Sequence, residues 1–463
     1  MITIEVKNVK SIIDKHLPLL EEKLAIFHPK YWHTTKWKDG VWDGKTHFLN
    51  LSTGKFPTGH LHIVQEFLKA EGLEYQLVYE QKNPVDEVDL SIIQPRMLQG
   101  ITLRKDQLEA IEQAILLEKG VIQMPTGTGK TEVAIAITEV LKLKTLFLVN
   151  SKSLLYQTQE RFIARLGCSE YEVGILGDGV HAPGSQITIA TVQSLDSMKK
   201  GNINFIGSRY FSRFMRDHKI IMFDECHHAS AKTWYTVGTW AHEAYYRYGF
   251  SGTPMDRDEI DAMELMAVTG QTIYKRKTQD AINDGDLCKI EMEILPNTEV
   301  VYGKNWQEVY NKGIVDSVKR NILICNEAIK HFHNKDKVLI LVRHIEHGDN
   351  LHRMLESYPI YFLHGKHSQK ERKAIICWFT KPGGKILIAS GIFDEGIDIP
   401  EINALIVASG GKSDVKTIQR IGRGLRKKPG NIFLNAYDFA DASQYLYEHS
   451  LRRKKIYERE GYV

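Results

Sequence analysis

One short stretch of the chain, Met124-Pro125-Thr126-Gly127-Thr128-Gly129-Lys130-Thr131, has the residue types that bind the phosphates of a nucleotide. In the pattern GxxxxGK(S/T), backbone N–H groups surround the phosphates, the lysine contacts the β and γ oxygens, and the hydroxyl reaches Mg²⁺. Met124 replaces the first glycine of that pattern, whereas Gly129, Lys130 and Thr131 keep its other end. We therefore expect residues 125–131 to bind ATP with Mg²⁺. The alternative is a glycine-rich loop without a catalytic role.

A pair of acids, Asp224 and Glu225, directly follows the apolar run 219–223. Residues at the carboxyl end of a strand in an open parallel sheet face the ligand. Asp224 is therefore expected to hold Mg²⁺, through water, and Glu225 to polarise the water that attacks the nucleotide. His227, two residues on, is expected to relay between the nucleotide and a second part of the protein. A helix N-terminus and a structural histidine are the alternatives.

Arg104 and Gln107 precede the phosphate loop and form a candidate site for the adenine base. A glutamine side chain can donate to and accept from the edge of adenine. The start of a surface helix is the alternative for these two residues. Residues 251–254, Ser-Gly-Thr-Pro, form a small polar turn after Phe250, for which an ordinary turn is the alternative.

Arginines are concentrated in residues 419–426, Gln-Arg-Ile-Gly-Arg-Gly-Leu-Arg. Helical spacing would place Gln419, Arg423 and Arg426 on one face. Arginines brought to a transferring phosphoryl group stabilise its charge and raise the rate by about a thousandfold or more. Gly396 and Asp398 follow an expected strand upstream and are candidates for close approach to the nucleotide. A solvated basic helix and a common turn are the respective alternatives.

The elements that would position these residues are apolar strands alternating with helices, which predicts parallel sheets covered on both faces. The rhythm occurs twice, so two similar α/β units in tandem are expected. A helix over 444–457 follows them, with the basic run 452–455 in its last turns, where cations suit the helix dipole. The expected strands are residues 121–124, 146–149, 187–190 and 219–223 in the first unit, and 337–342, 361–363, 385–389, 404–407 and 432–437 in the second.

Residues 1–95 are rich in aromatic side chains and predict a small α+β domain. Aromatic rings such as Trp32, Trp37 and Trp42 can stack on exposed bases at a fork. Most of these rings are nevertheless expected to form the core of the small domain. The expected elements are a strand over 2–6, helices over 11–27 and 61–71, a turn-rich hairpin around 38–44 and a linker over 81–94.

The bulk composition of the 463 residues is that of an ordinary globular protein, with 43% hydrophobic and 25% charged residues. The net charge of +4 does not by itself imply a polyanionic partner, so basic residues that bind nucleic acid must cluster in space. None of the five cysteines has CxxC spacing, which indicates neither a zinc site nor a disulfide framework. No apolar run reaches the roughly 18 residues needed to cross a bilayer, and we expect a cytoplasmic protein with no membrane partner.

In combination and order, the motifs of residues 96–445 resemble those of superfamily-two helicases of the DExH type. The resemblance implies two tandem RecA-like parallel-sheet domains, each with the P-loop NTPase architecture, and ATP between them. It also implies tracking along a single strand, usually 3′ to 5′. Loops at strand ends that match the family's strand-contacting motifs would touch phosphates without reading bases, although each could be a plain βα connection. Their residues are Ser151, Lys152, Thr191, Gln193, Arg343, His364 and Gly365.

A narrower resemblance points to phage helicases of the UvsW kind, which remodel branched DNA, and a T5-like phage is the source that it suggests. It rests on Trp42-Asp43-Gly44, on residues 59–61, and on Tyr437-Asp438-Phe439 with the Tyr- and Arg-rich helix that follows. Ser390-Gly391 departs from the Thr-Asp of many relatives. The implied domains are a DNA- or junction-binding domain (1–95), two helicase domains (96–285 and 286–445) and a basic C-terminal helix (446–463).

The function that these residues favour is an ATP-dependent DNA helicase that remodels branched, forked or single-stranded DNA as a monomer. Two alternatives stay open within the motor class: an RNA helicase, or a duplex translocase that does not unwind. A non-catalytic nucleic-acid-binding module is a third hypothesis, which the complete set Lys130, Asp224, Glu225, Arg423 and Arg426 disfavours.

Overall fold

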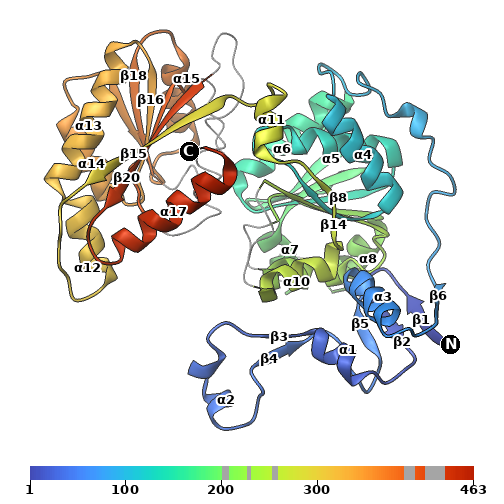
Figure 1. Cartoon of the computed structure of the whole chain (residues 1–463). Coiled ribbons are helices and arrows are strands. Elements are labelled where there is room, and N and C mark those ends of the chain that lie inside the picture. Colours follow the sequence, from blue (N-terminus) through green and yellow to red (C-terminus); the bar gives the residue numbers. More distant parts are fainter. Residues whose placement is uncertain (201–207, 227–230, 253–258, 391–401, 412–432, 463) are drawn as a thin grey trace. The chain divides into compact units, whose positions relative to one another are not determined.

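The computed structural model describes residues 1–200, 208–226, 231–252, 259–390, 402–411 and 433–462 (Figure 1). The chain forms two compact units, residues 1–276 and residues 277–463, except that the four residues 125–128 group with the second unit. Each unit is built around its own large sheet of parallel strands. None of the helices in the described ranges combines the length and the apolar character that a membrane span requires.

The first unit contains an eight-stranded sheet in the order β10-β9-β11-β8-β12-β13-β7-β14. Neighbouring strands are parallel except for the pair of β9 and β10. Strands β8, β11 and β12 are buried along their whole length, as expected where helices cover both faces. The strands are β7 Lys119–Gln123, β8 Thr145–Val149, β9 Val173–Gly177, β10 Val180–Ala182, β11 Ile187–Thr191, β12 Ile220–Phe223, β13 Tyr246–Ser251 and β14 Thr272–Lys275.

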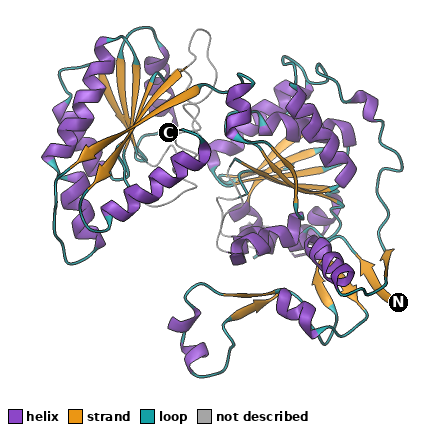
Figure 2. Cartoon of the chain, viewed as in Figure 1, coloured by secondary structure: helices purple, strands orange, loops and turns teal. Residues whose placement is uncertain are grey.

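Helices cover this sheet on both sides (Figure 2). One face shares a hydrophobic core with α4 (Lys105–Leu117), α5 (Lys130–Leu141) and α6 (Lys152–Leu166). The other face packs against α7 (Val192–Lys199), α8 (Ser208–Asp217), α9 (Ala231–Trp240) and α10 (Glu259–Thr269).

The second unit repeats this construction with a six-stranded parallel sheet in the order β15-β20-β19-β16-β18-β17. Separate hydrophobic cores lie on its two faces. The expectation of two tandem RecA-like parallel sheets is thus confirmed. The strands are β15 Lys289–Asn297, β16 Lys337–Leu341, β17 Ile360–Leu363, β18 Lys385–Ala389, β19 Ala404–Val407 and β20 Phe433–Asp441, and the helices are α11 Thr278–Asn283, α12 Trp306–Tyr310, α13 Val318–His333, α14 Ile345–Met354, α15 Gln369–Thr380 and α17 Leu446–Glu460.

The N-terminal residues form a separate four-stranded sheet in the order β5-β2-β1-β6, with α3 (Leu61–Ala70) packed against it. The expected strand over 2–6 and the expected helix from residue 61 are both present. The expected helix over 11–27 is wrong, because the buried and exposed residues of 10–13 alternate as in a strand and Pro18 starts a short helix. That region instead contains β2 (Lys10–Ile13), α1 (Pro18–Lys23) and β3 (Ala25–Phe27), and the remaining strands are β1 Ile2–Val6, β4 Lys45–His47, β5 Lys55–Pro57 and β6 Tyr75–Tyr79.

This small sheet is docked on α10 of the first unit through a tight backbone contact. A Cβ atom on Gly59 would lie 1.8 Å from the carbonyl oxygen of Met266, so only glycine fits there. The neighbouring His60 is fully buried, and its Nε2 lies 2.8 Å from the carbonyl oxygen of Met263. Ile260 and Met263 of α10 belong to the core of the small sheet. The N-terminal region therefore folds as part of the first unit.

The buried His60 predicts acid sensitivity of this docking. Burial lowers the pKa of His60 from 6.5 to about 4, so between these values the unfolded chain binds a proton that the folded chain excludes. The buried His60 therefore lowers the free energy of unfolding as the pH falls from 6.5 to about 4, by up to about 3 kcal/mol. We expect His60→Gln, whose amide can still donate to Met263, to flatten the decline of the urea midpoint between pH 7.5 and 4.5. The exposed His16→Gln is the control, and an unchanged decline in His60→Gln contradicts the account.

Candidate active site

The phosphate loop connects β7 to α5 and has a backbone that requires its glycines. Gly127 and Gly129 have φ of +90° and +83°, which side chains disfavour. A Cβ atom on Gly129 would also lie 2.4 Å from Nε2 of Gln107. Met124, which stands where the pattern has its first glycine, is fully buried in the core beneath the loop. An apolar residue is accepted there because that position serves packing.

Hydrogen bonds hold the shape of the loop. The hydroxyl of Thr128 donates to the carbonyl of Pro125 at 2.7 Å, and the N–H of Met124 donates to the carbonyl of Ser251 at 3.0 Å. The buried Thr126 Oγ1 has no hydrogen-bond partner among the described residues. Because a buried polar group without a partner is costly, this hydroxyl fits a site that a polar ligand completes.

Three charged side chains meet at the carboxyl edge of the sheet. Lys130 Nζ lies 3.3 Å from Oε1 of Glu225, and the two side chains are only 7% and 21% exposed. Asp224 is 6% exposed and directly precedes Glu225. The three come together because β7 and β12 end at the same edge, with only β13 between them. Sequence reasoning paired the loop with these acids, and the structure brings them into contact.

Among the described residues, this cluster brings two acidic side chains to one basic side chain. Burial, and then the nearby charge of Glu225, raise the pKa of Asp224 to about 7, while Lys130 opposes the rise. Two carboxylates thus face one ammonium group in a buried place. Such a cluster favours a further cation, because a positive charge would relieve the repulsion between the acids.

The backbone of Glu225 is in the left-handed region, with φ of +44°. Its N–H donates to Asp224 Oδ1 at 3.0 Å. A residue other than glycine in this conformation costs of order 1 kcal/mol or more, and such residues concentrate at functional sites. The strain turns the Glu225 carboxylate towards Lys130.

Gln107 packs against the phosphate loop. Its Oε1 accepts from the N–H of Arg104 at 2.9 Å, and its Nε2 lies 3.5 Å from the carbonyl of Gly129. The guanidinium of Arg104 pairs with Asp106 at 3.0 Å, and Asp106 also pairs with Arg276. The two candidate adenine-binding residues are therefore fixed beside the loop by the start of α4.

Sequence reasoning missed Arg161 of α6. Its Nε lies 3.8 Å from Oε1 of Glu132, in the first turn of α5, and its charge lowers the pKa of Asp224. No motif points to this arginine, because its role follows only from the packing of α6 beside α5.

Several expected site residues lie outside the described ranges. They are His227, Thr253, Pro254, Gly396, Asp398, Gln419, Arg423 and Arg426.

The expected strand-contacting residues of the first unit lie at the carboxyl ends of β8 and β11. Ser151 caps α6 by accepting from the N–H of Leu154 at 3.3 Å, and Lys152 pairs with Asp178. Thr191 Oγ1 is 2.7 Å from Oγ of Ser194, and Gln193 is exposed at the start of α7. Because β8 and β11 are neighbours, both groups share one edge of the sheet.

In the second unit, Arg343 and His364 follow β16 and β17 in the same way. The guanidinium of Arg343 lies 5.7 Å from the ring centre of Tyr310. The ring centres of His364 and His367 lie 4.1 Å apart with the rings tilted, and a Cβ atom on Gly365 would meet no atom of the described residues within 4 Å. This loop is therefore open to an approaching backbone.

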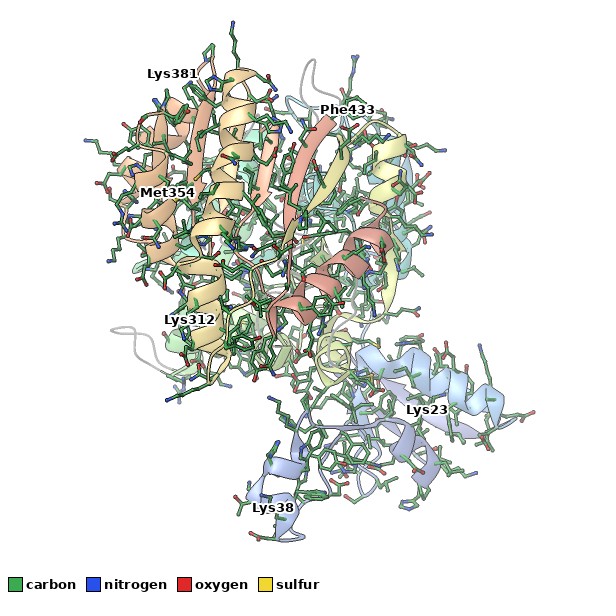
Figure 3. The ribbon with its side chains drawn as sticks, turned by 60° about the vertical axis from the view of Figure 1, so that its left-hand side comes forward. Lys23, Lys38, Lys312, Met354, Lys381 and Phe433 are labelled. Carbon is green, nitrogen blue, oxygen red and sulfur yellow. The ribbon has the colours of Figure 1, made fainter. Side chains whose placement is uncertain are left out.

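Residues 25–47 project from the N-terminal sheet, and we call this projection the arm. In the arm β3 pairs with β4, and Lys38 lies near the far end (Figure 3). Its rings cluster around Tyr31, whose centre lies 5.2 Å from that of Trp32 and 5.3 Å from that of Trp37. The expectation that most rings form a core is wrong for Trp32 and Trp37, which are 49% and 39% exposed. Trp42 is half-buried, and its indole N–H donates to the carbonyl of Lys45 at 2.8 Å.

Comparisons with known proteins agree with this geometry. Residues 100–256 match the model for the res subunit of type III restriction enzymes, and residues 319–428 match that for the helicase conserved C-terminal domain. The ATP-dependent DNA helicase uvsW of Enterobacteria phage T4 is 22% identical over 458 residues, 94% of this chain and 88% of that protein. The chain is a UvsW-like helicase of superfamily two. The DNA 3′-5′ translocase XPB2 of Sulfurisphaera tokodaii is 24% identical over 400 residues, 77% of this helicase and 84% of that protein.

Solved structures show the same fold for this helicase. The crystal structure of T4 UvsW matches with a TM-score of 0.51 at 20% identity and covers 99% of this chain and 97% of that one. The restriction-modification enzyme LlaBIII bound to DNA matches with a TM-score of 0.57 at 16% identity, over 84% of this chain and 32% of that one.

The Lys130–Glu225 pair predicts two separable defects. Lys130→Ala should abolish ATP hydrolysis because the phosphates lose their cation. Glu225→Gln should lower kcat by about a hundredfold or more, since an amide cannot activate water, while ATP still binds. Steady-state turnover and binding of a fluorescent ATP analogue check both variants. Glu139→Gln, an exposed acid of α5, is the matched control. Normal turnover in Lys130→Ala contradicts the assignment.

Proposed function

We propose that this helicase is an ATP-driven motor that remodels branched DNA by branch migration or fork regression. The main observation that supports an ATP-driven motor is the buried contact between Lys130 of the phosphate loop and Glu225 at the end of β12. The choice of branched DNA as the substrate is supported by the phage relative, whose match covers 94% of the chain.

The residues of the site fit ATP with Mg²⁺. The N-terminal N–H groups of α5 and the unpartnered hydroxyl of Thr126 suit phosphate oxygens. Thr131 and Asp224 would hold Mg²⁺, which supplies positive charge to the transferring phosphoryl group. Lys130 would exchange its contact with Glu225 for one with the phosphates, and Gln107 with Arg104 would hold the adenine.

Hydrolysis then depends on the groups that this exchange releases. Glu225, no longer bound to Lys130, would orient the attacking water. Burial and then the charge of Glu225 raise the pKa of the neighbouring Asp224, while Lys130 and Arg161 oppose the rise, so a cation bound there would favour the ionised form of Asp224. Arg423, Arg426 and Gln419 of the second unit complete the site, with Gly396 and Asp398 close to the nucleotide.

The DNA strand would run over the loops that follow β8, β11, β16 and β17. Hydroxyl, amide and cationic groups of these loops contact phosphates, which gives grip without sequence preference. The arm would bind the junction, because exposed rings beside lysines can stack on unpaired bases. The helicase would act as a monomer.

Two other motor functions are separated by one experiment. The first alternative is an RNA helicase, because the structure is similar to that of S. cerevisiae Dbp5 bound to RNA, with a TM-score of 0.53 at 17% identity. The second alternative is a duplex translocase, because residues 100–256 match the restriction-enzyme family model. We expect ATP hydrolysis by the full chain to be stimulated more by forks and four-way junctions than by single-stranded DNA, and least by RNA. Greater stimulation by RNA, or by blunt duplex alone, contradicts the proposal.

The arm gives a sharper prediction. Trp32→Ala combined with Trp37→Ala should weaken binding to forks and four-way junctions by about tenfold or more, because each stacked base contributes about 1–3 kcal/mol. Single-strand-stimulated ATP hydrolysis should stay unchanged, since these rings lie outside the ATP site. Tyr302→Ala, which removes a ring that is 80% exposed, is the control. Equal junction affinity in the double variant and the control would overturn the role of the arm.

A further inference from the structure

Two buried arginines of the second unit connect β20 to the four residues that follow β19. Arg453 of α17 binds Asp438 through Nε at 2.6 Å and through Nη2 at 3.0 Å. Its Nη1 donates to the carbonyl of Gly411 at 2.8 Å. Sequence reasoning placed Arg453 in a basic run that suits the helix dipole, and the structure adds that this side chain is only 1% exposed.

Arg320 of α13 makes a parallel connection. Its Nε donates to Asp441 Oδ1 at 3.0 Å, and its Nη1 donates to the carbonyl of Ala408 at 2.8 Å. Between the two arginines, the hydroxyl of Tyr310 donates to the carbonyl of Ser409 at 2.6 Å. Three buried side chains from three helices thus hold three of the four carbonyls of residues 408–411, those of Ala408, Ser409 and Gly411.

This arrangement is too specific to serve packing alone. Removing a guanidinium from water is expensive and is often no better for stability than an apolar replacement. Here each guanidinium binds one carboxylate of β20 and one carbonyl of the 408–411 segment. The network therefore fixes the position of this segment relative to β20.

The held segment adjoins the arginine motif. Gly411 is followed in the sequence by residues 412–432, which contain Gln419, Arg423 and Arg426. Phe433 then begins β20 (Figure 3), the strand that carries both carboxylates. The two ends of the motif-bearing stretch are therefore tied to one buried network.

Helix α17 is anchored at two further positions between Arg453 and its C-terminal end. The hydroxyl of Tyr457 donates to Asp438 Oδ2 at 2.5 Å. At the end of the helix, Glu460 accepts from the hydroxyl of Thr278 at 3.1 Å, at the start of α11. These contacts fix the position of α17, and therefore the position from which the side chain of Arg453 extends.

We propose that Arg453 is a positioning residue for ATP hydrolysis, which sets where the arginine-bearing stretch begins by holding Gly411 against Asp438. The inference rests on the proposed function, because it assumes that Arg423 and Arg426 act on the nucleotide. Arg453 touches no substrate, so its loss affects the chemical step and spares binding.

The test compares Arg453→Lys with Lys455→Met, which removes an exposed charge from the same helix, in the full chain. Lysine keeps the charge beside Asp438 but cannot also reach Gly411. We expect the DNA-stimulated kcat to fall about tenfold, the equivalent of one charged hydrogen bond, with KM for ATP and DNA affinity within twofold of wild type. Thermal melting shows whether the variant is folded.

A second variant keeps the test decisive if Arg453→Lys fails to fold. Tyr310→Phe removes only the hydroxyl that holds Ser409, and we expect it to lower kcat several-fold without raising KM. A kcat equal to that of Lys455→Met, or a parallel change in KM and kcat, overturns the inference. An inactive wild-type chain with every nucleic acid would instead overturn the proposed function.

Discussion

The confinement of one ammonium and two carboxylate groups at the edge of a parallel sheet is the constraint on which the rest of this structure depends. Lys130, Asp224 and Glu225 are almost removed from water, so their charges act on one another with little screening. The strands that end there must be parallel, close and covered on both faces to keep the charges buried. The cluster therefore needs the whole eight-stranded sheet.

Charge burial recurs in the second unit with another purpose. Arg320 and Arg453 each meet a carboxylate of β20 and at least one backbone carbonyl, while the buried Nη2 of Arg320 has no hydrogen-bond partner among the described residues. Among the described side chains, the first cluster brings two carboxylates to one ammonium group, whereas in the second each guanidinium meets a carboxylate of β20. In the proposed motor, the first cluster would respond to a nucleotide and the second would hold the start of the stretch that carries the proposed catalytic arginines.

Much of the fold could be predicted because most strands are short apolar runs, and several of these runs end at residues whose types indicate a chemical role. The strand before Asp224 and the strand before the phosphate loop were predictable from their apolar runs. Strand β13 was not, because a charged residue, Arg247, lies second in the strand and interrupts its apolar pattern. That guanidinium is buried against the carbonyls of Gly238, Ala241 and Val268, which no local pattern reveals.

The remaining differences concern tertiary partners. Arg453 looked like part of a basic run because its partner Asp438 is fifteen residues away, at the far side of a turn. Trp32 and Trp37 looked like core residues because composition does not say that β3 and β4 project from the small sheet. Lys130 and Glu225 were predicted to share one nucleotide site because both follow apolar strands, although their direct contact was not predicted.

The most direct measurement of the central claim follows strand exchange in a four-way junction with homologous arms, by energy transfer between dyes on two arms. With the full chain, ATP and Mg²⁺, the account predicts that the arms exchange at a rate that rises with ATP concentration. With a non-hydrolysable ATP analogue, the junction should be bound but its arms should stay in place. Exchange at the same rate with the analogue, or none with ATP while ATP is being hydrolysed, would contradict the account.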